Sequence, residues 1–372
     1  RSQDWLKRWR SAETVEFMHP NHRYEISLAP NDPLYGNQDY LKQIRAEQAW
    51  DIVRSNEEII IAVVDTGVDL NHPDLSGRLV EGVNLIDPSK PPMDDNGHGT
   101  NIAGILAAAG NNDVGTAGLL WNAKIMPIKA LEANGTGDED KLGIGIMHAI
   151  DNGAKIVVLS LGLNKYSNFM HNIVQYAEVK NVLLVAAAGN ENNEVKYPAA
   201  YSTVLAVGGV DKNNNVVASS NKGAELDLVA PWEVYTTGRG GRYVYNHGTS
   251  MAAPQVAAVA ALVWSRYPHL TAAQLREHLR HTADDLGPAG WDEASGYGLL
   301  RADRAVSTPP KADYYEPNNT RADAKRISYE KTLTAGFTPG DEDWYRIEVP
   351  YDGTVQFRFM NAPANFRVKL SL

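Results

Sequence analysis

The sequence predicts an α/β fold of three layers, in which a mainly parallel sheet lies between two layers of helices. Between residues 58 and 281, short segments rich in Val, Ile and Leu alternate with longer segments of helical pattern. Strands that are apolar along their whole length indicate a sheet covered on both faces, and their alternation with helices indicates parallel pairing. In such a sheet the functional crevice is expected at the carboxyl ends of the strands.

The predicted elements follow one another in chain order. Thr271, with Gln274 three residues later, has the spacing of a capping box, which marks the start of the last helix. Strands are expected over 58–64, 124–130, 155–161, 182–188 and 203–209, and helices over 98–109, 139–152, 168–179, 250–266 and 271–281.

Length and composition set outer limits on the protein. A chain of 372 residues exceeds the usual size of one domain, so one large domain and a smaller one are expected. The net charge of −10 argues against a nucleic-acid binder. No run of 18 apolar residues occurs, so no transmembrane segment is expected. Cysteine is absent, which excludes both disulfides and a thiol nucleophile.

Three residues carry the chemistry that the sequence predicts. Asp65 ends a buried strand, whereas His98 and Ser250 each stand at the start of a helix. A serine hydroxyl needs a base within hydrogen-bond reach, and a carboxylate can hold the imidazole of that base in the required tautomer. The chain order Asp, His, Ser occurs among the convergent serine hydrolases. Taken alone, Thr249 or Ser250 would be only a helix N-cap. His247 is a rival base.

The segments around these residues resemble the subtilisin-like serine proteases, over roughly residues 29–308. The resemblance implies a subtilisin-like fold and a serine endopeptidase that cleaves extended polypeptides through an acyl-enzyme. It assigns Asp65, His98 and Ser250 to the triad and Asn190 to the oxyanion hole beside the Ser250 amide. Outside this context, an Asn after Gly is a turn residue. The matching segments are 59–69, 94–104, 185–191 and 247–254.

The same resemblance assigns a peptide cleft. Two segments, 134–137 and 160–162, match backbones that sandwich a substrate as added β-strands. Lys196 falls near the first specificity pocket. Three alternatives stay open for Lys196. It pairs with Glu191 or Glu194, it points to solvent, or it selects substrates with an acidic or amide side chain immediately before the cleaved bond. The expected substrate-binding residues are Gly135, Thr136, Gly137, Ser160, Leu161, Gly162, Ala187, Ala188, Gly189 and Lys196.

Calcium is the expected cofactor, again from the resemblance. Asp32, Asp74 and Asn112 match side-chain ligands, and Val114 and Thr116 match residues that bind through carbonyl oxygens. Calcium prefers such a set of oxygen ligands. The alternative is that these residues only form turns.

The chain departs from the family pattern at three positions near the motifs. Asn101 and Gln255 each stand where a His is common, and Ala253 stands where a Thr is common. None belongs to the triad, so the departures concern the cleft rather than catalysis.

The segments outside the catalytic region are expected to be separate parts. Residues 1–28 read as the tail of an inhibitory prosegment, or alternatively as a basic N-terminal extension. Residues 309–317 have the composition of a linker. Residues 318–372 resemble a partial bacterial pre-peptidase C-terminal β-sandwich, and extended strands are expected over 313–320, 340–349 and 351–359.

The resemblance also implies a secreted protein, extracellular or associated with the cell wall, that is a monomer. Two other functions stay open. One is a catalytically silent fold that binds peptides, against which the complete Asp65, His98 and Ser250 set argues. The other is an esterase, which would usually carry a G-x-S-x-G elbow and a different chain order.

Overall fold

The structure is a computed structural model of the chain. It describes residues 29–54, 58–336, 338, 340–350, 352–360 and 366–369. The prediction of a prosegment tail over 1–28 lies outside these residues. Among the described residues, no helix is long and apolar enough to cross a bilayer.

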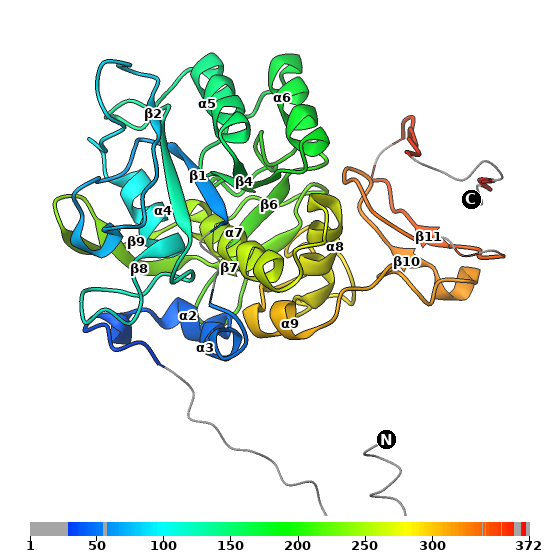
Figure 1. Cartoon of the computed structure of the whole chain (residues 1–372). Helices are drawn as coiled ribbons and strands as arrows, with labels where there is room; N and C mark the ends of the chain where they lie inside the picture. Colours follow the sequence, from blue (N-terminus) through cyan, green and yellow to red (C-terminus); the bar gives the residue numbers. More distant parts are fainter. Residues whose placement is uncertain are drawn as a thin grey trace, which may run out of the picture.

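A parallel sheet of seven strands forms the middle of the molecule (Figure 1). Its strand order is β2-β3-β1-β4-β5-β6-β7, and every neighbouring pair is parallel. The mainly parallel sheet predicted from the sequence is therefore confirmed. The strands are β1 Ile60–Asp65, β2 Val83–Asn84, β3 Lys124–Lys129, β4 Ala154–Leu159, β5 Leu183–Ala187, β6 Leu205–Val210 and β7 Leu228–Pro231.

Helices cover both faces of this sheet, which gives the predicted three layers. Strand β1 shows why, because Ile61 and Val63 contribute to one hydrophobic core and Ala62 and Val64 to the other. The first core includes residues of α2, α3, α4, α7, α8 and α9, and the second includes residues of α5 and α6. These helices are α2 Asp39–Gln43, α3 Ala46–Trp50, α4 His98–Ala107, α5 Glu139–Asp151, α6 Asn168–Val179, α7 Thr249–Arg266, α8 Ala272–Thr282 and α9 Ala302–Ser307.

The predicted elements agree with the observed ones to within one or two residues at most ends. The capping box at the start of α8 is present, with Thr271 and Gln274 bonded reciprocally. The sequence analysis did not identify the short β2 and β7, or the hairpin formed by β8 (Glu233–Gly238) and β9 (Arg242–His247). His247 ends β9, in the segment that leads into α7.

The C-terminal part differs from the expected strands. Its regular structure among the described residues is a helical turn at Arg321–Asp323 and two short strands, β10 (Lys325–Arg326) and β11 (Tyr345–Arg346), which pair in parallel. Among the described residues, neither 313–320 nor 352–359 forms a strand, although strands were predicted over 313–320 and 351–359. Residues 352–360 are exposed throughout, and a strand without a neighbour or a buried face is not stable.

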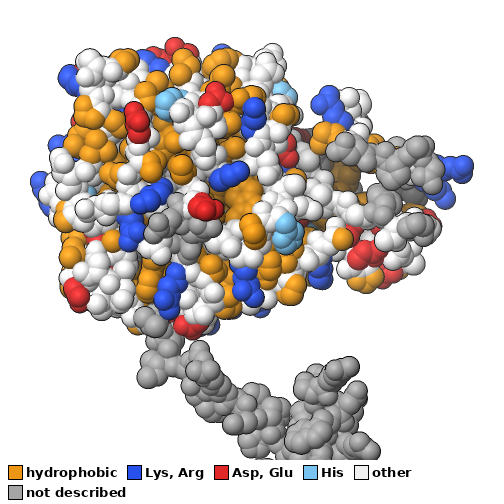
Figure 2. Space-filling view, viewed as in Figure 1, with side chains coloured by type: hydrophobic (Ala, Val, Ile, Leu, Met, Phe, Trp, Pro, Cys, Tyr) orange, Lys and Arg blue, Asp and Glu red, His pale blue; other side chains and the backbone are white. Residues whose placement is uncertain are grey.

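Side chains of both signs are scattered over the face seen in Figure 2, with hydrophobic side chains between them. No extended stripe of Lys and Arg is visible among the described residues on this face.

Candidate active site

Asp65 and His98 meet at the carboxyl end of the sheet. Asp65 is the last residue of β1 and is fully buried. His98 is the first residue of α4, and its Nδ1 lies 2.8 Å from Oδ1 and 3.0 Å from Oδ2 of Asp65. Burial opposes a charged imidazole, but the negative charge and hydrogen bond of Asp65 outweigh it and raise the pKa of His98. Asp65 therefore orients the ring and stabilises its protonated form.

Asp94 builds the turn that presents His98. Its Oδ1 accepts hydrogen bonds from the backbone amides of Asn96 and Gly97, and its Oδ2 accepts one from the amide of Thr100. The sequence analysis did not identify Asp94 as part of the site. Its signal is an acid placed a few residues before an Asn-Gly pair, a pattern typical of side chains that cap turns.

The glycines beside His98 are required for two different reasons. Gly97 is the N-cap of α4 with φ of 119°, a conformation that favours glycine. At Gly99, an added Cβ would lie 2.0 Å from the carbonyl oxygen of Gly67, so only a glycine allows α4 to approach the end of β1. The close backbone approach therefore requires a glycine at position 99.

Ser250 is the second residue of α7, whose N-cap is Gly248. Neither Thr249 nor Ser250 is the cap residue, so the simpler interpretation of this serine as an N-cap is wrong. Gly248 has φ of 130°, a conformation that only glycine adopts easily. The amide of Thr249 finds its acceptor in Oδ1 of Asn190 instead of a cap side chain.

A reciprocal pair of hydrogen bonds joins Ser250 to Ser160, which directly follows β4. The Ser250 hydroxyl donates to the Ser160 carbonyl oxygen at 3.0 Å, and the Ser160 hydroxyl donates to the Ser250 carbonyl oxygen at 2.9 Å. Pro254 explains the second bond, because it has no amide hydrogen to donate to the carbonyl four residues earlier. The Ser250 hydroxyl thus donates to Ser160 and not to His98 as triad chemistry requires.

Asn190 is held against the start of α7. Its Oδ1 accepts hydrogen bonds from the amide of Thr249 at 3.0 Å and from the Thr249 hydroxyl at 2.8 Å. The same hydroxyl accepts the amide of Gly189 at 3.1 Å. These bonds fix the orientation of the Asn190 side chain, whose nitrogen is its hydrogen-bond donor.

Two hollows lie at this end of the sheet. The one beside His98 has a volume of about 320 Å³, and Asn101 and Asn246 line it. The Asn246 side chain donates to Oδ1 of Asn101 at 2.7 Å, so Asn101 ties α4 to β9 at the position where the family often has a His. The hollow beside Ser250 has a volume of about 150 Å³ and is lined by Leu161, Gly162, Ala187, Gly189, Asn190, Glu191, Lys196, Thr249 and Ser250.

The second hollow brings together five of the ten residues predicted for substrate binding, namely Leu161, Gly162, Ala187, Gly189 and Lys196. Lys196 forms an ion pair with Glu191 at its edge, which is one of the outcomes left open from the sequence. Ala188 is fully buried behind this hollow and accepts the Lys196 amide at its carbonyl oxygen. The loop containing Gly135, Thr136 and Gly137 is exposed and lines neither hollow.

The family comparison decides the identity of this arrangement. The model of the subtilase family matches residues 56–298, which is more than half of the chain. The chain belongs to the subtilase family. It is a subtilisin-like serine protease with a parallel sheet flanked by helices.

Named relatives of this subtilase agree with that assignment. Thermitase of Thermoactinomyces vulgaris is 41% identical over 271 residues, which cover 72% of this chain and 96% of thermitase. A thermophilic serine proteinase of Bacillus sp. (strain AK1) is 39% identical over 296 residues, 79% of this chain and 73% of the relative. The cell wall-associated protease of Bacillus subtilis (strain 168) is 36% identical over 333 residues, 79% of this chain and 37% of that protein.

The subtilase also brings together the residues predicted to bind calcium. Asp32 accepts the amide of Asn112 at 3.3 Å, and Asp74 accepts the Asn112 side-chain nitrogen at 3.3 Å and the Thr116 amide at 2.8 Å. The Val114 amide donates to Oδ1 of Asn112 at 2.9 Å. Burial raises the pKa of Asp32 and of Asp74, and the charge of Asp32 adds to the rise at Asp74. Carboxylate and carbonyl oxygens are the ligand types that calcium prefers.

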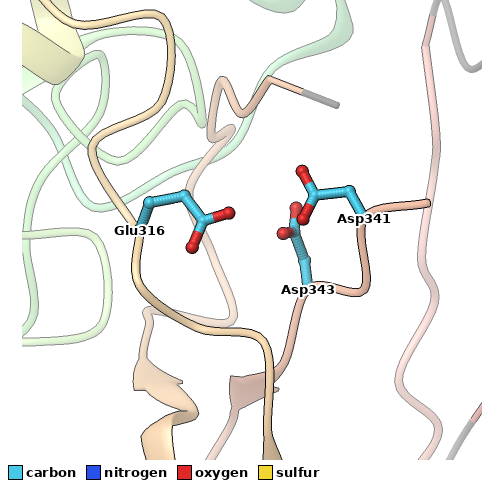
Figure 3. A group of neighbouring side chains, drawn as sticks. All are labelled: Glu316, Asp341 and Asp343. Atoms are coloured by element: carbon cyan, nitrogen blue, oxygen red, sulfur yellow. The ribbon is translucent and has the colours of Figure 1, made fainter. Parts of the chain in front are cut away.

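A second group of carboxylates lies in the C-terminal part (Figure 3). Glu316, Asp341 and Asp343 each place an oxygen within 4.8 Å of the others. Burial, followed by the charges of Asp313 and Asp341, raises the pKa of Asp343 to about 6. The sequence analysis did not single out these residues. Their side chains are partly exposed, and we assign no function to them.

Proposed function

We propose that this subtilase is an endopeptidase in which Ser250 attacks the peptide carbonyl, His98 is the general base and Asp65 orients His98. The observation that carries the proposal is the hydrogen bond of His98 Nδ1 to the buried Asp65. That bond leaves Nε2 of His98 as the nitrogen that can take a proton from a serine hydroxyl.

The proposed reaction needs the Ser250 side chain to rotate. Its hydroxyl donates to Ser160, and a staggered rotamer facing His98 would allow the proton to pass to Nε2. Catalytic hydrogen bonds often align only when substrate is bound. The Ser250 oxygen then bonds to the substrate carbon, and His98 returns the proton to the leaving amine. A water molecule then gives a proton to His98 and attacks the acyl carbon. His98 returns the proton to the Ser250 oxygen as the bond between Ser250 and the acyl group breaks.

Asn190 is proposed to stabilise the developing oxyanion. Its side-chain oxygen is anchored by Thr249, at the start of the helix that carries Ser250. A donor fixed before the reaction needs no reorganisation when the negative charge develops. The Ser250 backbone amide is proposed as the second donor.

The proposed substrate is an extended polypeptide. The segments 135–137 and 160–162 would pair with its backbone, and the hollow beside Ser250 would take the side chain before the cleaved bond. The ion pair of Lys196 with Glu191 at this hollow balances the lysine charge. We therefore expect no selection for acidic side chains, and profiling a peptide library with Lys196→Gly and the natural protein tests this.

Calcium is proposed to stabilise the fold. Asp32, Asp74 and Asn112 would hold it through side chains, with Val114 and Thr116 contributing carbonyl oxygens. The ion would neutralise the two buried carboxylates. Support comes from the burial of both acids and from the turns that hold these five residues together.

Secretion and a prosegment complete the proposal. Relatives include an extracellular protease of Natrialba magadii and the cell wall-associated protease of Bacillus subtilis. We propose that this subtilase is likewise exported and is a monomer. We also propose four parts: the tail of an inhibitory prosegment over 1–28, the catalytic domain over 29–308, the linker over 309–317 and part of a β-sandwich over 318–372. Sequencing the N-terminus of the exported protein and measuring its mass in solution test these points.

A silent peptide-binding fold is the second candidate. The observation in its favour is that the Ser250 hydroxyl donates to Ser160. In such a protein, Ser250 would be only a structural residue that joins α7 to β4. The rate of peptide hydrolysis measured with Ser250→Ala would then equal that of the natural protein.

Replacing Ser250 tests the proposal. Ser250→Ala should lower peptide hydrolysis by several orders of magnitude while leaving the unfolding midpoint nearly unchanged, because the side chain is partly exposed. Ser265→Ala is a matched control, since Ser265 is a partly exposed serine of the same helix, donates its hydroxyl to a backbone carbonyl and lines neither hollow. If Ser250→Ala hydrolyses peptides as fast as the natural protein, the peptidase proposal is wrong.

A further inference from the structure

The hollow beside His98 has an arginine in its wall. Arg239 lines this hollow together with Gly238, Asn101 and Asn246. It directly follows β8 and begins the short turn that leads into β9. Among the described residues that line the hollow, Arg239 is the one whose side chain carries a permanent charge. The position and the partners of this arginine therefore decide what the hollow can bind.

The turn that carries Arg239 is fixed against the motif of the catalytic histidine. Asp69 is buried, and its Oδ2 accepts the amide of Gly240 at 2.8 Å. On the other side, a Cβ added to Gly97 would lie 3.9 Å from Cβ of Arg239. Gly97 directly precedes His98, so the arginine side chain starts next to the proposed general base.

The charge of Arg239 has no acidic partner among the described residues. Its Nη1 donates to the backbone carbonyl oxygen of Asp95, and no described carboxylate forms an ion pair with it. The carboxylate of Asp95 is instead paired with Lys129 at 2.6 Å. A guanidinium has five N–H donors, and the carbonyl of Asp95 uses only one of them. Donors are therefore left for a carboxylate from outside the chain.

The amide side chains of the hollow are already bound within the protein. Asn101 donates through Nδ2 to the carbonyl oxygen of Thr237 at 2.7 Å, and its Oδ1 accepts Nδ2 of Asn246 at 2.7 Å. Oδ1 of Asn246 accepts the amide of the next residue at 2.8 Å. Asn96 is bound through both its oxygen and its nitrogen. Arg239 is thus the side chain with donors left for a charged ligand.

The proposed reaction determines which part of a substrate reaches Arg239. His98 returns a proton to the leaving amine, so the residue that follows the cleaved bond must lie beside His98. The side chain before the bond would occupy the other hollow, where Lys196 is already paired with Glu191. The positive charge is therefore balanced on the side before the bond and unbalanced on the side after it.

We propose that Arg239 is a specificity-determining residue that selects peptides with Glu or Asp directly after the cleaved bond. The substrate carboxylate accepts charge-assisted hydrogen bonds from the guanidinium, whose planar fork matches its two oxygens. The inference rests on the proposed peptidase function and deepens it, because it names a class of substrate for the same site.

Two fluorogenic peptides that differ only in Glu or Gln directly after the cleaved bond test the proposal. Both are built on a sequence that the natural protein cleaves in a denatured protein. The natural protein should cleave the Glu peptide with a kcat/KM roughly 3- to 30-fold higher, because an ion pair to an exposed arginine contributes modestly. Arg239→Gln should make the two values equal, and Arg239→Glu should make the Gln peptide the better substrate.

A second arginine of the same turn provides the matched control. Arg242 is also exposed, but it does not line the hollow. Arg242→Gln should therefore keep the preference for the Glu peptide. Raising the ionic strength from about 0.1 M to about 1 M should reduce the preference in the natural protein, because salt screens exposed charges.

The ratio between the two peptides separates specificity from a structural role. Losing the bond to the carbonyl of Asp95 lowers both values of kcat/KM equally, whereas losing the ion pair lowers only that of the Glu peptide. If the natural protein shows no preference, or if Arg239→Gln keeps it, the proposal is wrong. If the natural protein cleaves no denatured protein at all, the proposed peptidase function is wrong instead.

Discussion

At the residue scale, the hydrogen bond between Asp65 and His98 determines which ring nitrogen of His98 can accept a proton. Because Nδ1 faces the carboxylate, the other ring nitrogen is left for the serine proton. The base must be neutral to accept that proton. In the proposed mechanism, the pKa of His98 therefore sets the acidic limit of activity.

The raised pKa of His98 predicts the pH dependence of kcat/KM. Activity should fall as the pH drops through a value above that of an ordinary histidine, because protonated His98 cannot act as a base. Asp65→Asn removes the charge that raises this pKa, so the limit should move to lower pH, and kcat should fall on the order of 10⁴-fold. A pH profile whose acidic limit is the same in both proteins would show that His98 is not the titrating base.

Asn190 provides the second prediction at this scale. Asn190→Leu should lower kcat about 10²- to 10³-fold with little change in KM, because the donated hydrogen bond forms mainly in the transition state. Steady-state kinetics on one peptide separates the two constants. A variant that changes KM alone would assign Asn190 to substrate binding.

At the element scale, strands were predictable where apolar residues run without interruption. Strand β1 is one example, since Ile61 and Val64 face different cores and neither face needs polar residues. The two-residue β2 carries no such run, and its pairing with β3 depends on residues far away in the chain. The motifs located Asp65, His98 and Ser250, but not the rotamer of Ser250.

Long-range contacts explain what the sequence could not predict. Asp94 acts through backbone amides that only the folded turn places around it. Lys331 is an ordinary lysine in the sequence, and its burial depends on carbonyl oxygens more than a hundred residues earlier. Neither environment has a local pattern that would reveal it.

The loops around Asp32 and Asp74 predict a response to calcium. At a calcium concentration of about a hundred times its Kd, the bound ion adds roughly 2.7 kcal/mol to the free energy of unfolding. Removing calcium should therefore lower the unfolding midpoint by about 5–10 °C. Thermal unfolding with and without a chelator measures the change. Asp74→Asn should abolish the response, whereas Asp87→Asn, at an acid far more exposed, should keep it. An unchanged midpoint in the natural protein would exclude the site.

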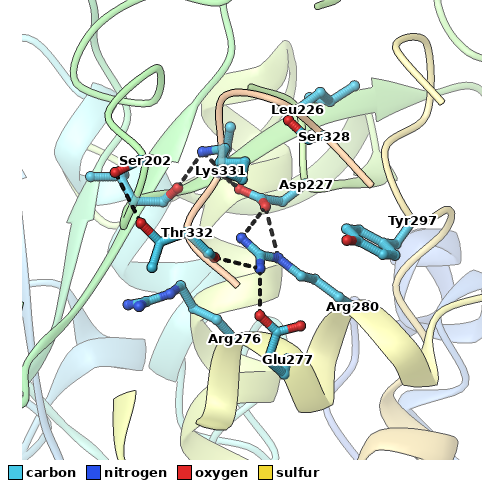
Figure 4. A network of polar contacts seen from close by, with 12 residues as sticks. Ser202, Leu226, Asp227, Arg276, Glu277, Arg280, Tyr297, Ser328, Lys331 and Thr332 are labelled. Carbon is cyan, nitrogen blue, oxygen red and sulfur yellow. Dashed lines mark hydrogen bonds and ion pairs between the residues drawn. The ribbon is translucent and has the colours of Figure 1, made fainter. Parts of the chain in front are cut away.

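At the scale of the whole molecule, buried polar contacts join the C-terminal part to the catalytic region (Figure 4). The chain has no cysteine, so no disulfide holds the C-terminal part to the catalytic region. Contacts such as those of Lys331 with Asp227 and of Tyr315 with Glu277 make that connection instead. The catalytic region and the segment around Lys331 therefore share one polar core.

Covalent labelling of Ser250 tests the central claim most directly. A fluorophosphonate reacts with a serine that an adjacent base activates, so mass spectrometry of the labelled protein should find one adduct, on Ser250. The same reaction with His98→Ala should be slower by orders of magnitude while the protein stays folded. A natural protein that cleaves peptides but carries the adduct on another serine, or none on Ser250, would contradict the account.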